Sequence, residues 1–304
     1  MQAFVFPGQG SQHRGMGKDL VDQFSEARHV FEEADEALGF SLSQICFEGS
    51  KDQLQLTKNT QPAMLVVSIA LFRILEKRGH TPDFVAGHSV GEHAAVVAAG
   101  GIDFRDAVRL VHKRGLLMQE VVPVGAGAMA AILGLELPDV ENICREVARD
   151  EVVSPANINS INQVVISGHR QAVDRATKLA HTRGARKVVD LPVSAPFHCE
   201  LMKPVESRLL KAMASISLCD LKVPLVNNLE ARAVRDVREV RDGLIRQVSS
   251  PVLWSSSIEK LVEMGVSTFV EVGPGKVLRG LIRKIAPSVN VLNVGNREQV
   301  EDYV

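Results

Sequence analysis

The chain has few aromatic side chains and few cysteines. Aromatic residues make up only 4%, with one tryptophan and one tyrosine, so a platform for stacking nucleic-acid bases is not expected. The cysteines are scattered and form no C-x-x-C pair, which argues against a disulfide framework and favours a reducing compartment. The four are Cys46, Cys144, Cys199 and Cys219.

An excess of one charge and long apolar runs are also absent. Lysine and arginine total 35 against 36 aspartates and glutamates, so the formal charge of −1 gives no general attraction to nucleic acid or anionic membranes. No stretch reaches the roughly 18 apolar residues of a membrane span. The first residues lack the basic and apolar regions of a signal peptide. We therefore expect a cytoplasmic protein with no nucleic-acid or membrane partner.

What remains is the composition of a folded globular protein. Hydrophobic residues make up 45% of the 304 residues and charged residues 23%, which is enough apolar mass for a sizeable core. At roughly 150 residues per domain, the length fits one large domain or two ordinary ones. No internal repeat or low-complexity tract appears.

Strand-like and helix-like segments alternate over much of the chain. The apolar residues 3–6 end at a proline and a glycine, which is typical of a buried strand followed by a glycine-rich loop. A strong helical pattern covers residues 60–78, with Thr60 as the expected N-cap. Such alternation predicts a parallel α/β sheet. Further strands are expected at 84–86, 225–227 and 268–272, and further helices at about 16–38, 91–99, 104–121, 237–248 and 252–264.

The middle of the chain has a different order of predicted strands and helices. Its pattern is strand, helix, strand, strand, helix, strand, which is the order of a ferredoxin-like unit. The expected strands are 129–133, 152–158, 163–167 and 187–193, and the expected helices are 138–149 and 169–183. We therefore expect a ferredoxin-like subdomain over residues 125–193, inserted into a large α/β domain made of residues 1–124 and 194–304.

The segment from Gly87 to Gly91 fits the pattern G-x-S-x-G. A serine on a sharp strand-to-helix turn needs small neighbours to expose its hydroxyl, and the following helix offers free N–H groups where an oxyanion would form. The predicted strand before Ser89 and the alanine-rich helix after it match this context. A plain strand–turn–helix junction is the alternative interpretation.

A serine nucleophile needs a general base, and nine histidines compete for that role. His198 is the strongest candidate, because it lies where the predicted insert returns to the main domain, and pockets are common between domains. His88 is too close to Ser89 along the chain to be an obvious base, but we expect it to line the pocket.

Five motifs follow one another along the chain: Phe6-Pro-Gly-Gln-Gly-Ser-Gln12, Gly87-His-Ser-Val-Gly-Glu92, Arg114-Gly-Leu-Leu-Met-Gln-Glu120, Pro196-Phe-His198 and Glu271-Val-Gly-Pro-Gly275. Together they closely resemble the malonyl-CoA:acyl-carrier-protein transacylases of fatty-acid and polyketide synthesis. The resemblance covers about residues 3–295 and implies an α/β-hydrolase-like core with a ferredoxin-like insert. That fold agrees with the one predicted from the alternating pattern.

The resemblance implies roles for individual residues. Ser89 would be the acylated nucleophile and His198 its general base. A backbone carbonyl near Gln247 would orient the imidazole in place of a carboxylate. The backbone N–H groups of Gln9 and Val90 would form the oxyanion hole.

The resemblance also implies how the acyl group is recognised. Arg114 would bind the malonyl carboxylate, because a planar guanidinium can pair with a carboxylate through two parallel hydrogen bonds. Without the resemblance, Arg114 reads as one more charge in a basic helical run. Gln61 and Asn159 resemble polar pocket residues, and Phe197 resembles the malonyl-selecting members rather than those that take a branched extender.

The expected reaction is a ping-pong transfer of malonyl from malonyl-CoA to the phosphopantetheine thiol of an acyl carrier protein. The resemblance favours a monomer, and no metal or redox cofactor is implied. Acyl carrier proteins are generally acidic, so a basic docking surface is expected near the site. Its candidates are Lys187, Arg279, Arg283 and Lys284.

Three alternatives remain open. A thioesterase of the same fold would need the serine and histidine but would have no use for Arg114. An ordinary α/β-hydrolase esterase would place its acid and then its histidine late in the chain, whereas His198 is followed by a further αβ region. A catalytically silent scaffold that binds carrier protein is the non-enzymatic alternative.

Overall fold

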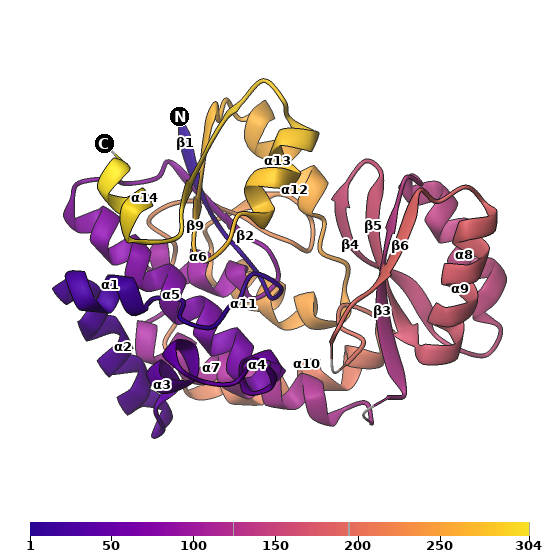
Figure 1. Ribbon diagram of the computed structural model, residues 1–304, viewed down its shortest axis with the longest axis horizontal. Helices are drawn as coiled ribbons and strands as arrows, with labels where there is room; N and C mark the ends of the chain where they lie inside the picture. The colour runs from indigo at the N-terminus through magenta and orange to yellow at the C-terminus, as the bar shows by residue number, and fades with distance from the viewer. Residues whose placement is uncertain (124, 194, 304) are drawn as a thin grey trace.

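The computed structural model describes residues 1–123, 125–193 and 195–303. A six-stranded sheet with helices on both faces forms the larger part, and a four-stranded sheet stands beside it (Figure 1). The large sheet has the order β10-β9-β1-β2-β7-β8. Its strands are β1 (Gln2–Phe6), β2 (Phe84–Gly87), β7 (Leu225–Val226), β8 (Ala233–Val234), β9 (Thr268–Val272) and β10 (Asn290–Val294).

The large sheet is parallel except at one edge, where β8 runs antiparallel to β7. Successive side chains of β1 alternate between two cores, as the two-residue period of a strand requires. Phe4 and Phe6 belong to the core on one face, and Ala3 and Val5 to the core on the other. The predicted parallel α/β sheet is therefore confirmed.

Helices cover both faces of this sheet. The first core is built mainly by helices from the first half of the chain, and the second by α12 and α13 (Figure 1). The helices are α1 (Lys18–Gln23), α2 (Ser25–Leu38), α3 (Leu42–Phe47), α4 (Lys51–Gln55), α5 (Thr57–Lys77), α6 (Gly91–Ala98), α7 (Phe104–Glu120), α10 (Lys203–Ala212), α11 (Val237–Arg246), α12 (Trp254–Glu263), α13 (Val277–Ile285) and α14 (Arg297–Asp302). Short 3-10 turns cover Glu200–Met202, Met213–Ser215 and Gln247–Ser249.

The smaller sheet is antiparallel and has the order β4-β5-β3-β6. Two helices cover its outer face, away from the large sheet (Figure 1). In chain order the elements are β3 (Gly127–Leu133), α8 (Leu137–Ala148), β4 (Val153–Ser160), β5 (Gln163–His169), α9 (Arg170–Thr182) and β6 (Lys187–Asp190), which is the predicted β-α-β-β-α-β succession. The domain boundaries at 124/125 and 193/194 stay a prediction, and residues 124 and 194 lie outside the described residues.

The two sheets are joined by backbone hydrogen bonds as well as by side-chain packing. The N–H of Val252 donates to Ala156 O at 2.9 Å, and the N–H of Ile158 donates to Val252 O at 2.9 Å. Ala156 also belongs to the first core of the large sheet. These contacts hold β4 beside the segment that precedes α12, so the two sheets are fixed relative to each other at this point.

Two helix predictions were wrong in detail. The pattern over 16–38 is two helices, because Phe24 adopts an extended conformation between α1 and α2. Helix α5 begins at Thr57, so Thr60 lies inside it and its hydroxyl donates back to Leu54 O at 2.5 Å. Tertiary packing overrides the capping signal: the first turn of α5 is buried, and a Cβ at Gly115 of α7 would lie 2.8 Å from Lys58 Cα.

Within the described residues, no helix is both long enough and apolar enough to cross a membrane.

Candidate active site

The carboxyl ends of three neighbouring strands supply one wall of the site. Gln9 follows β1, Ser89 follows β2, and Asn228 follows β7, and these strands are adjacent and parallel. Open α/β sheets bind their ligands at this end, outside the last residues of the strands. The topology therefore brings together three polar residues that are far apart in the sequence.

Ser89 lies on a sharp turn between β2 and α6. Its φ of 53° is in the left-handed region, which costs free energy for a residue with a side chain. Two glycines make the turn sterically allowed. A Cβ at Gly87 would lie 2.0 Å from Gly91 C, and a Cβ at Gly91 would lie 2.1 Å from Phe6 O. The structure thus shows the strand–turn–helix context that the G-x-S-x-G pattern predicts.

The hydroxyl of Ser89 meets the imidazole of His198. Ser89 Oγ and His198 Nε2 lie 2.7 Å apart. His198 also has a left-handed backbone, with φ of 60°, and its N–H donates to Val248 O at 3.1 Å. This backbone contact holds the His198 side chain against the Ser89 hydroxyl.

The second nitrogen of the imidazole has a fixed partner. His198 Nδ1 lies 2.9 Å from the backbone oxygen of Gln247, which can only accept, so Nδ1 carries the proton and Nε2 carries the lone pair. Burial, followed by the charge of Arg114, lowers the pKa of His198 to about 3. The imidazole is therefore neutral near neutral pH and able to accept the Ser89 proton.

Arg114 of α7 points into the same pocket and is only 1% exposed. One terminal nitrogen donates to Gln61 Oε1 at 2.7 Å. The other donates to Gln247 Oε1 at 2.8 Å and to Ser89 Oγ at 3.3 Å. Burial lowers the pKa of Arg114 to about 10, opposed by the charge of Glu92, so the guanidinium stays positive near neutral pH. A buried cation lies within reach of the nucleophile.

Gln247 joins most of these groups. Its backbone oxygen contacts His198 and its side-chain oxygen contacts Arg114. Its amide nitrogen faces three acceptors, donating to Ser89 O at 3.0 Å, to Glu92 Oε2 at 2.5 Å and to Asn228 Oδ1 at 3.2 Å. Gln247 is fully buried, so these hydrogen bonds of its side chain are shielded from solvent.

Backbone donors face the same space. Gln9 and Val90 line the pocket beside Ser89, and within the described part of the chain their N–H groups donate to no protein acceptor. Val90 directly precedes the first residue of α6, so its N–H lies at the positive end of the helix dipole. Two unpaired N–H groups beside a serine hydroxyl suit a developing oxyanion.

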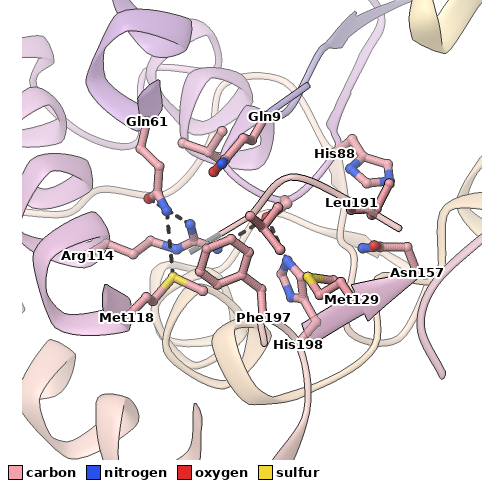
Figure 2. A pocket seen from close by; sticks show the side chains of 13 residues that line it. Gln9, Gln61, His88, Arg114, Met118, Met129, Asn157, Leu191, Phe197 and His198 are labelled. Carbon is pink, nitrogen blue, oxygen red and sulfur yellow. Dashed lines mark hydrogen bonds between the residues drawn. The ribbon is translucent and has the colours of Figure 1, made fainter. Parts of the chain in front are cut away.

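The pocket brings together nearly all the residues predicted from the sequence. Figure 2 shows Gln61 and Arg114 on one side, His88 on the other, and Phe197 and His198 between them. Two of the predicted residues do not line this pocket. Gln247 lies behind it, in contact with Arg114 and His198. Asn159 lines an adjoining groove, and its Oδ1 lies 2.8 Å from His88 Nε2, so it contacts the site through that histidine. The residues that line the pocket are Gln9, Gln61, His88, Ser89, Val90, Arg114, Met118, Met129, Asn157, Leu191, Val193, Phe197 and His198.

Three polar residues of the site were not predicted: Asn157, which lines the pocket, and Asn228 and Glu92, which lie behind the serine. Asn228 accepts the Ser89 N–H at 2.8 Å and donates to Gly87 O at 2.6 Å, so it holds both ends of the turn. Glu92 accepts from Gln247 and from the N–H of Asn228. Glu92 was visible as the last residue of the second motif, whereas Asn228 had only its place after a strand as a signal.

Apolar side chains complete the pocket. Met118 and Met129 line it, and the sulfur of Met118 accepts from Gln61 Nε2 at 3.6 Å. Met118 lies four residues after Arg114, so both project from the same face of α7. This spacing could have identified it as a pocket residue once Arg114 was chosen.

A second groove continues from the pocket toward the molecular surface. It shares Gln9, His88, Asn157 and Leu191 with the pocket and ends at the first turns of α13. Arg283 and Lys284 of α13 are exposed, and Lys284 Nζ donates to Gln163 Oε1 at the groove rim at 3.1 Å. Arg279, by contrast, lines a separate hollow at the other side of α13, near the C-terminal helix.

Within the described residues, no group of three or more histidine, cysteine, aspartate or glutamate side chains could hold a metal ion. The polar side chains that line the pocket are two imidazoles, one guanidinium, amides and one hydroxyl. Such a set suits an anion and a proton transfer.

The family model described as an acyl transferase domain matches residues 3–296. The malonyl CoA-acyl carrier protein transacylase of Bacillus subtilis is 45% identical over 98% of this chain and 95% of its own length. An acyl carrier protein S-malonyltransferase of Vibrio cholerae has a similar structure, with a TM-score of 0.97, 43% identity, and coverage of 100% of this chain and 99% of that one. So does a malonyl-transacylase in complex with a type II PKS acyl-carrier protein, with a TM-score of 0.97, 41% identity, and coverage of 99% and 97%. This chain belongs to the acyl transferase domain family.

Proposed function

We propose that the protein transfers a malonyl group from malonyl-CoA to the phosphopantetheine thiol of an acyl carrier protein, through an ester on Ser89. The observation that carries the proposal is the 2.7 Å contact between Ser89 Oγ and His198 Nε2, with the Arg114 guanidinium 3.3 Å from the same oxygen. The relatives described above are malonyl transacylases, which supports the proposal.

The first half-reaction acylates the serine. As Ser89 Oγ attacks the thioester carbonyl, its proton passes to His198 Nε2, and Gln247 O stabilises the imidazolium at Nδ1. The N–H groups of Gln9 and Val90 stabilise the tetrahedral oxyanion. One such donor contributes on the order of 10²–10³ in rate. The C–S bond then breaks, and the CoA sulfur leaves with the proton from His198.

The second half-reaction runs the same steps with a different thiol. The carrier-protein thiol gives its proton to His198 Nε2, and its sulfur attacks the Ser89 ester. The C–O bond breaks, and Ser89 Oγ recovers the proton. The acyl donor leaves before the acceptor thiol attacks the Ser89 ester. A single pocket therefore serves the donor and the acceptor in turn, which is a ping-pong mechanism.

Arg114 selects the acyl group. A malonyl carboxylate must be buried beside the reacting carbonyl, and a buried carboxylate needs a paired charge. Arg114 supplies that charge, and its contacts with Gln61 and Gln247 aim two terminal nitrogens toward the pocket. Phe197 and Met118 limit the room for a branched acyl chain.

We place the reaction in the cytoplasm, in a monomer that uses no metal or redox cofactor. The four cysteines are free and support a reducing compartment. The groove toward α13 offers a path for phosphopantetheine, and the exposed Arg283 and Lys284 at its end suit an acidic carrier protein.

The alternatives fit the site less well. A thioesterase would admit water and would not need a buried cation beside the ester, yet Arg114 is buried and bonded to three residues. A late acid–histidine pair of an ordinary esterase does not match, because His198 is oriented by a backbone carbonyl. A silent scaffold would not need a serine and a histidine in hydrogen-bond contact.

The proposal is tested by mixing the protein with malonyl-CoA and a holo-acyl carrier protein and measuring the mass of the carrier protein. Wild type should convert it to the malonyl form, and Ser89→Ala should not. The matched control is the apo carrier protein, which lacks the thiol and should stay unmodified. Release of free malonate without any malonyl carrier protein would show a hydrolase instead.

A further inference from the structure

Glu92 is a buried carboxylate that the proposed reaction does not use. It lies in the first turn of α6, three residues after Ser89, and is 1% exposed. Its side chain points away from the pocket lining and toward the polar residues behind the serine. Burying a carboxylate is costly unless it is paired and hydrogen-bonded, so its contacts need an explanation.

The contacts of Glu92 converge on one oxygen. Glu92 Oε2 accepts from Gln247 Nε2 at 2.5 Å and from the N–H of Asn228 at 3.2 Å. Burial raises the pKa of Glu92 to about 7, while these two hydrogen bonds and the charge of Arg114 oppose the shift. The carboxylate therefore lies behind the active serine, in electrostatic contact with Arg114 and with Gln247 between them.

A glutamine amide can face either way unless its partners decide the orientation. The three groups that face Gln247 Nε2 are Glu92 Oε2, Ser89 O and Asn228 Oδ1, and all of them accept. A flipped amide would set its oxygen against these acceptors and its NH₂ against the guanidinium of Arg114, which only donates. Of the three acceptors, the carboxyl oxygen of Glu92 is the shortest contact and the only one that belongs to an ionisable side chain.

Resting on the proposed role of Arg114, we infer that Glu92 is a positioning residue for acyl-group selection: its carboxylate fixes the Gln247 amide, whose oxygen holds Arg114 ready for the malonyl carboxylate. Glu92 touches neither substrate nor the reacting atoms. It acts indirectly, through the 2.8 Å hydrogen bond that Arg114 donates to Gln247 Oε1.

The experiment compares two variants of similar size and equal charge. Glu92→Gln keeps an oxygen that can accept from Gln247 and Asn228, whereas Glu92→Met fills the same space without any acceptor. For each, kcat/KM is measured with malonyl-CoA and with acetyl-CoA. We expect Glu92→Met to lower the malonyl-to-acetyl ratio by about tenfold, the effect of one lost hydrogen bond to a charged group. We expect Glu92→Gln to keep the ratio within about threefold of wild type.

The ratio separates positioning from stability, because a merely structural role would lower both reactions together. An unchanged ratio in Glu92→Met overturns the inference, and so does an equal fall of the ratio in both variants, which would assign the effect to charge. If Glu92→Met does not fold, Glu92→Asp replaces it, since it keeps the charge but withdraws the oxygen by one methylene. A wild-type ratio in Glu92→Asp then counts against the inference.

Arg114→Ala serves as the reference that distinguishes the two proposals. If Arg114→Ala leaves the malonyl-to-acetyl ratio unchanged, the proposed selection by Arg114 fails. If Arg114→Ala abolishes the preference while Glu92→Met retains it, only the inference about Glu92 fails.

Discussion

At the scale of single residues, the pocket holds a hydroxyl with a neutral imidazole and a buried cation, each within hydrogen-bond distance of that hydroxyl. Ser89 Oγ contacts both His198 Nε2 and a terminal nitrogen of Arg114. The cation has two effects. It disfavours protonation of His198, which keeps the base available, and it offers a charge to the carboxylate of an incoming malonyl group.

Replacing Arg114 by alanine should change which acyl group is transferred. Hydrogen bonds to a charged group contribute about 1.5–3 kcal/mol each, so kcat/KM for malonyl-CoA should fall by about ten- to a hundredfold or more. Acetyl-CoA has no carboxylate, and its transfer should fall much less. Equal losses measured with the two donors would show that Arg114 does not recognise the carboxylate.

The pH dependence of acylation should reflect the low pKa of His198. Its pKa of about 3 lies below the ordinary value of 6.5, so the base form persists as the pH falls through 6.5. In the free protein, kcat/KM for acylation should then stay flat down to about pH 5. The profile is best measured in Glu92→Gln. Glu92 is a second buried ionisable group near Ser89, and its pKa of about 7 would otherwise add a titration to the profile. An acid limb centred near 6.5 in that variant would contradict this environment for His198.

Ser89 and His198 were predictable from local signals, whereas the role of Arg114 came only from the family resemblance. Ser89 is recognisable from the glycines two residues before and after it, and His198 from a motif next to the predicted insert. Asn228 was not predictable, because its role comes from strand order: β7 lies beside β2 in the sheet although about 140 residues separate them in the chain. Which strand neighbours which is a property of the fold and leaves no mark in a single sequence.

At the scale of elements, the active turn depends on a close approach of backbone to backbone. A Cβ at Gly91 would lie 2.1 Å from Phe6 O, so α6 could not start where it does beside the end of β1. The helix N-terminus and the loop after β1 together place Val90 and Gln9 on the same side of Ser89.

Alanine at Gly91 should therefore destabilise the protein and abolish acylation. Overpacking of this kind costs about 1–3 kcal/mol or more, measured as a lower melting temperature. Gly280 is the matched control: it is exposed within α13, and no atom outside its neighbourhood lies within 4 Å of a Cβ placed there. Gly280→Ala should stabilise the protein by about 0.5–1 kcal/mol, since alanine favours a helix. Equal melting temperatures for the two variants would contradict the steric account.

Element types were easier to predict than element ends. Periodicity located most of the strands and the long helices, because burial of one face imposes it. It missed the strands β8 and β10 and the helices α3, α4, α10, α13 and α14, and it joined α1 to α2 through Phe24. Local capping signals misplaced the start of α5, where packing against α7 at Gly115 decides the first turn. Tertiary contacts of this kind are invisible to a pattern that considers one segment at a time.

At the scale of the whole molecule, two sheets enclose the pocket. Ser89 follows β2 of the large sheet, and Met129 and Asn157 belong to β3 and β4 of the smaller sheet. The groove that leaves the pocket runs between them toward α13, where Arg283 and Lys284 are exposed. Arg279 is a weaker docking candidate than the sequence suggested, because it lines a hollow on another side of the same helix.

Charge reversal at the end of the groove should weaken the binding of the carrier protein and leave the reaction with malonyl-CoA unaffected. In Arg283→Glu/Lys284→Glu we expect the KM for the carrier protein to rise and to lose its dependence on salt, while acylation by malonyl-CoA stays unchanged. Arg145→Glu/Lys178→Glu is the matched control, since both residues are exposed on α8 and α9, on the outer face of the smaller sheet. A KM that rises equally in the two double variants would point to net charge and not to a docking surface.

Acylation of Ser89 by malonyl-CoA is tested most directly by the intact mass of the protein after mixing with malonyl-CoA, with no carrier protein present. We expect wild type to gain one malonyl group, carried by the peptide that contains Ser89, and we expect Ser89→Ala to gain none. A Ser89→Ala protein that still gained the malonyl mass, or a malonyl group found on a different residue of the wild type, would contradict the account.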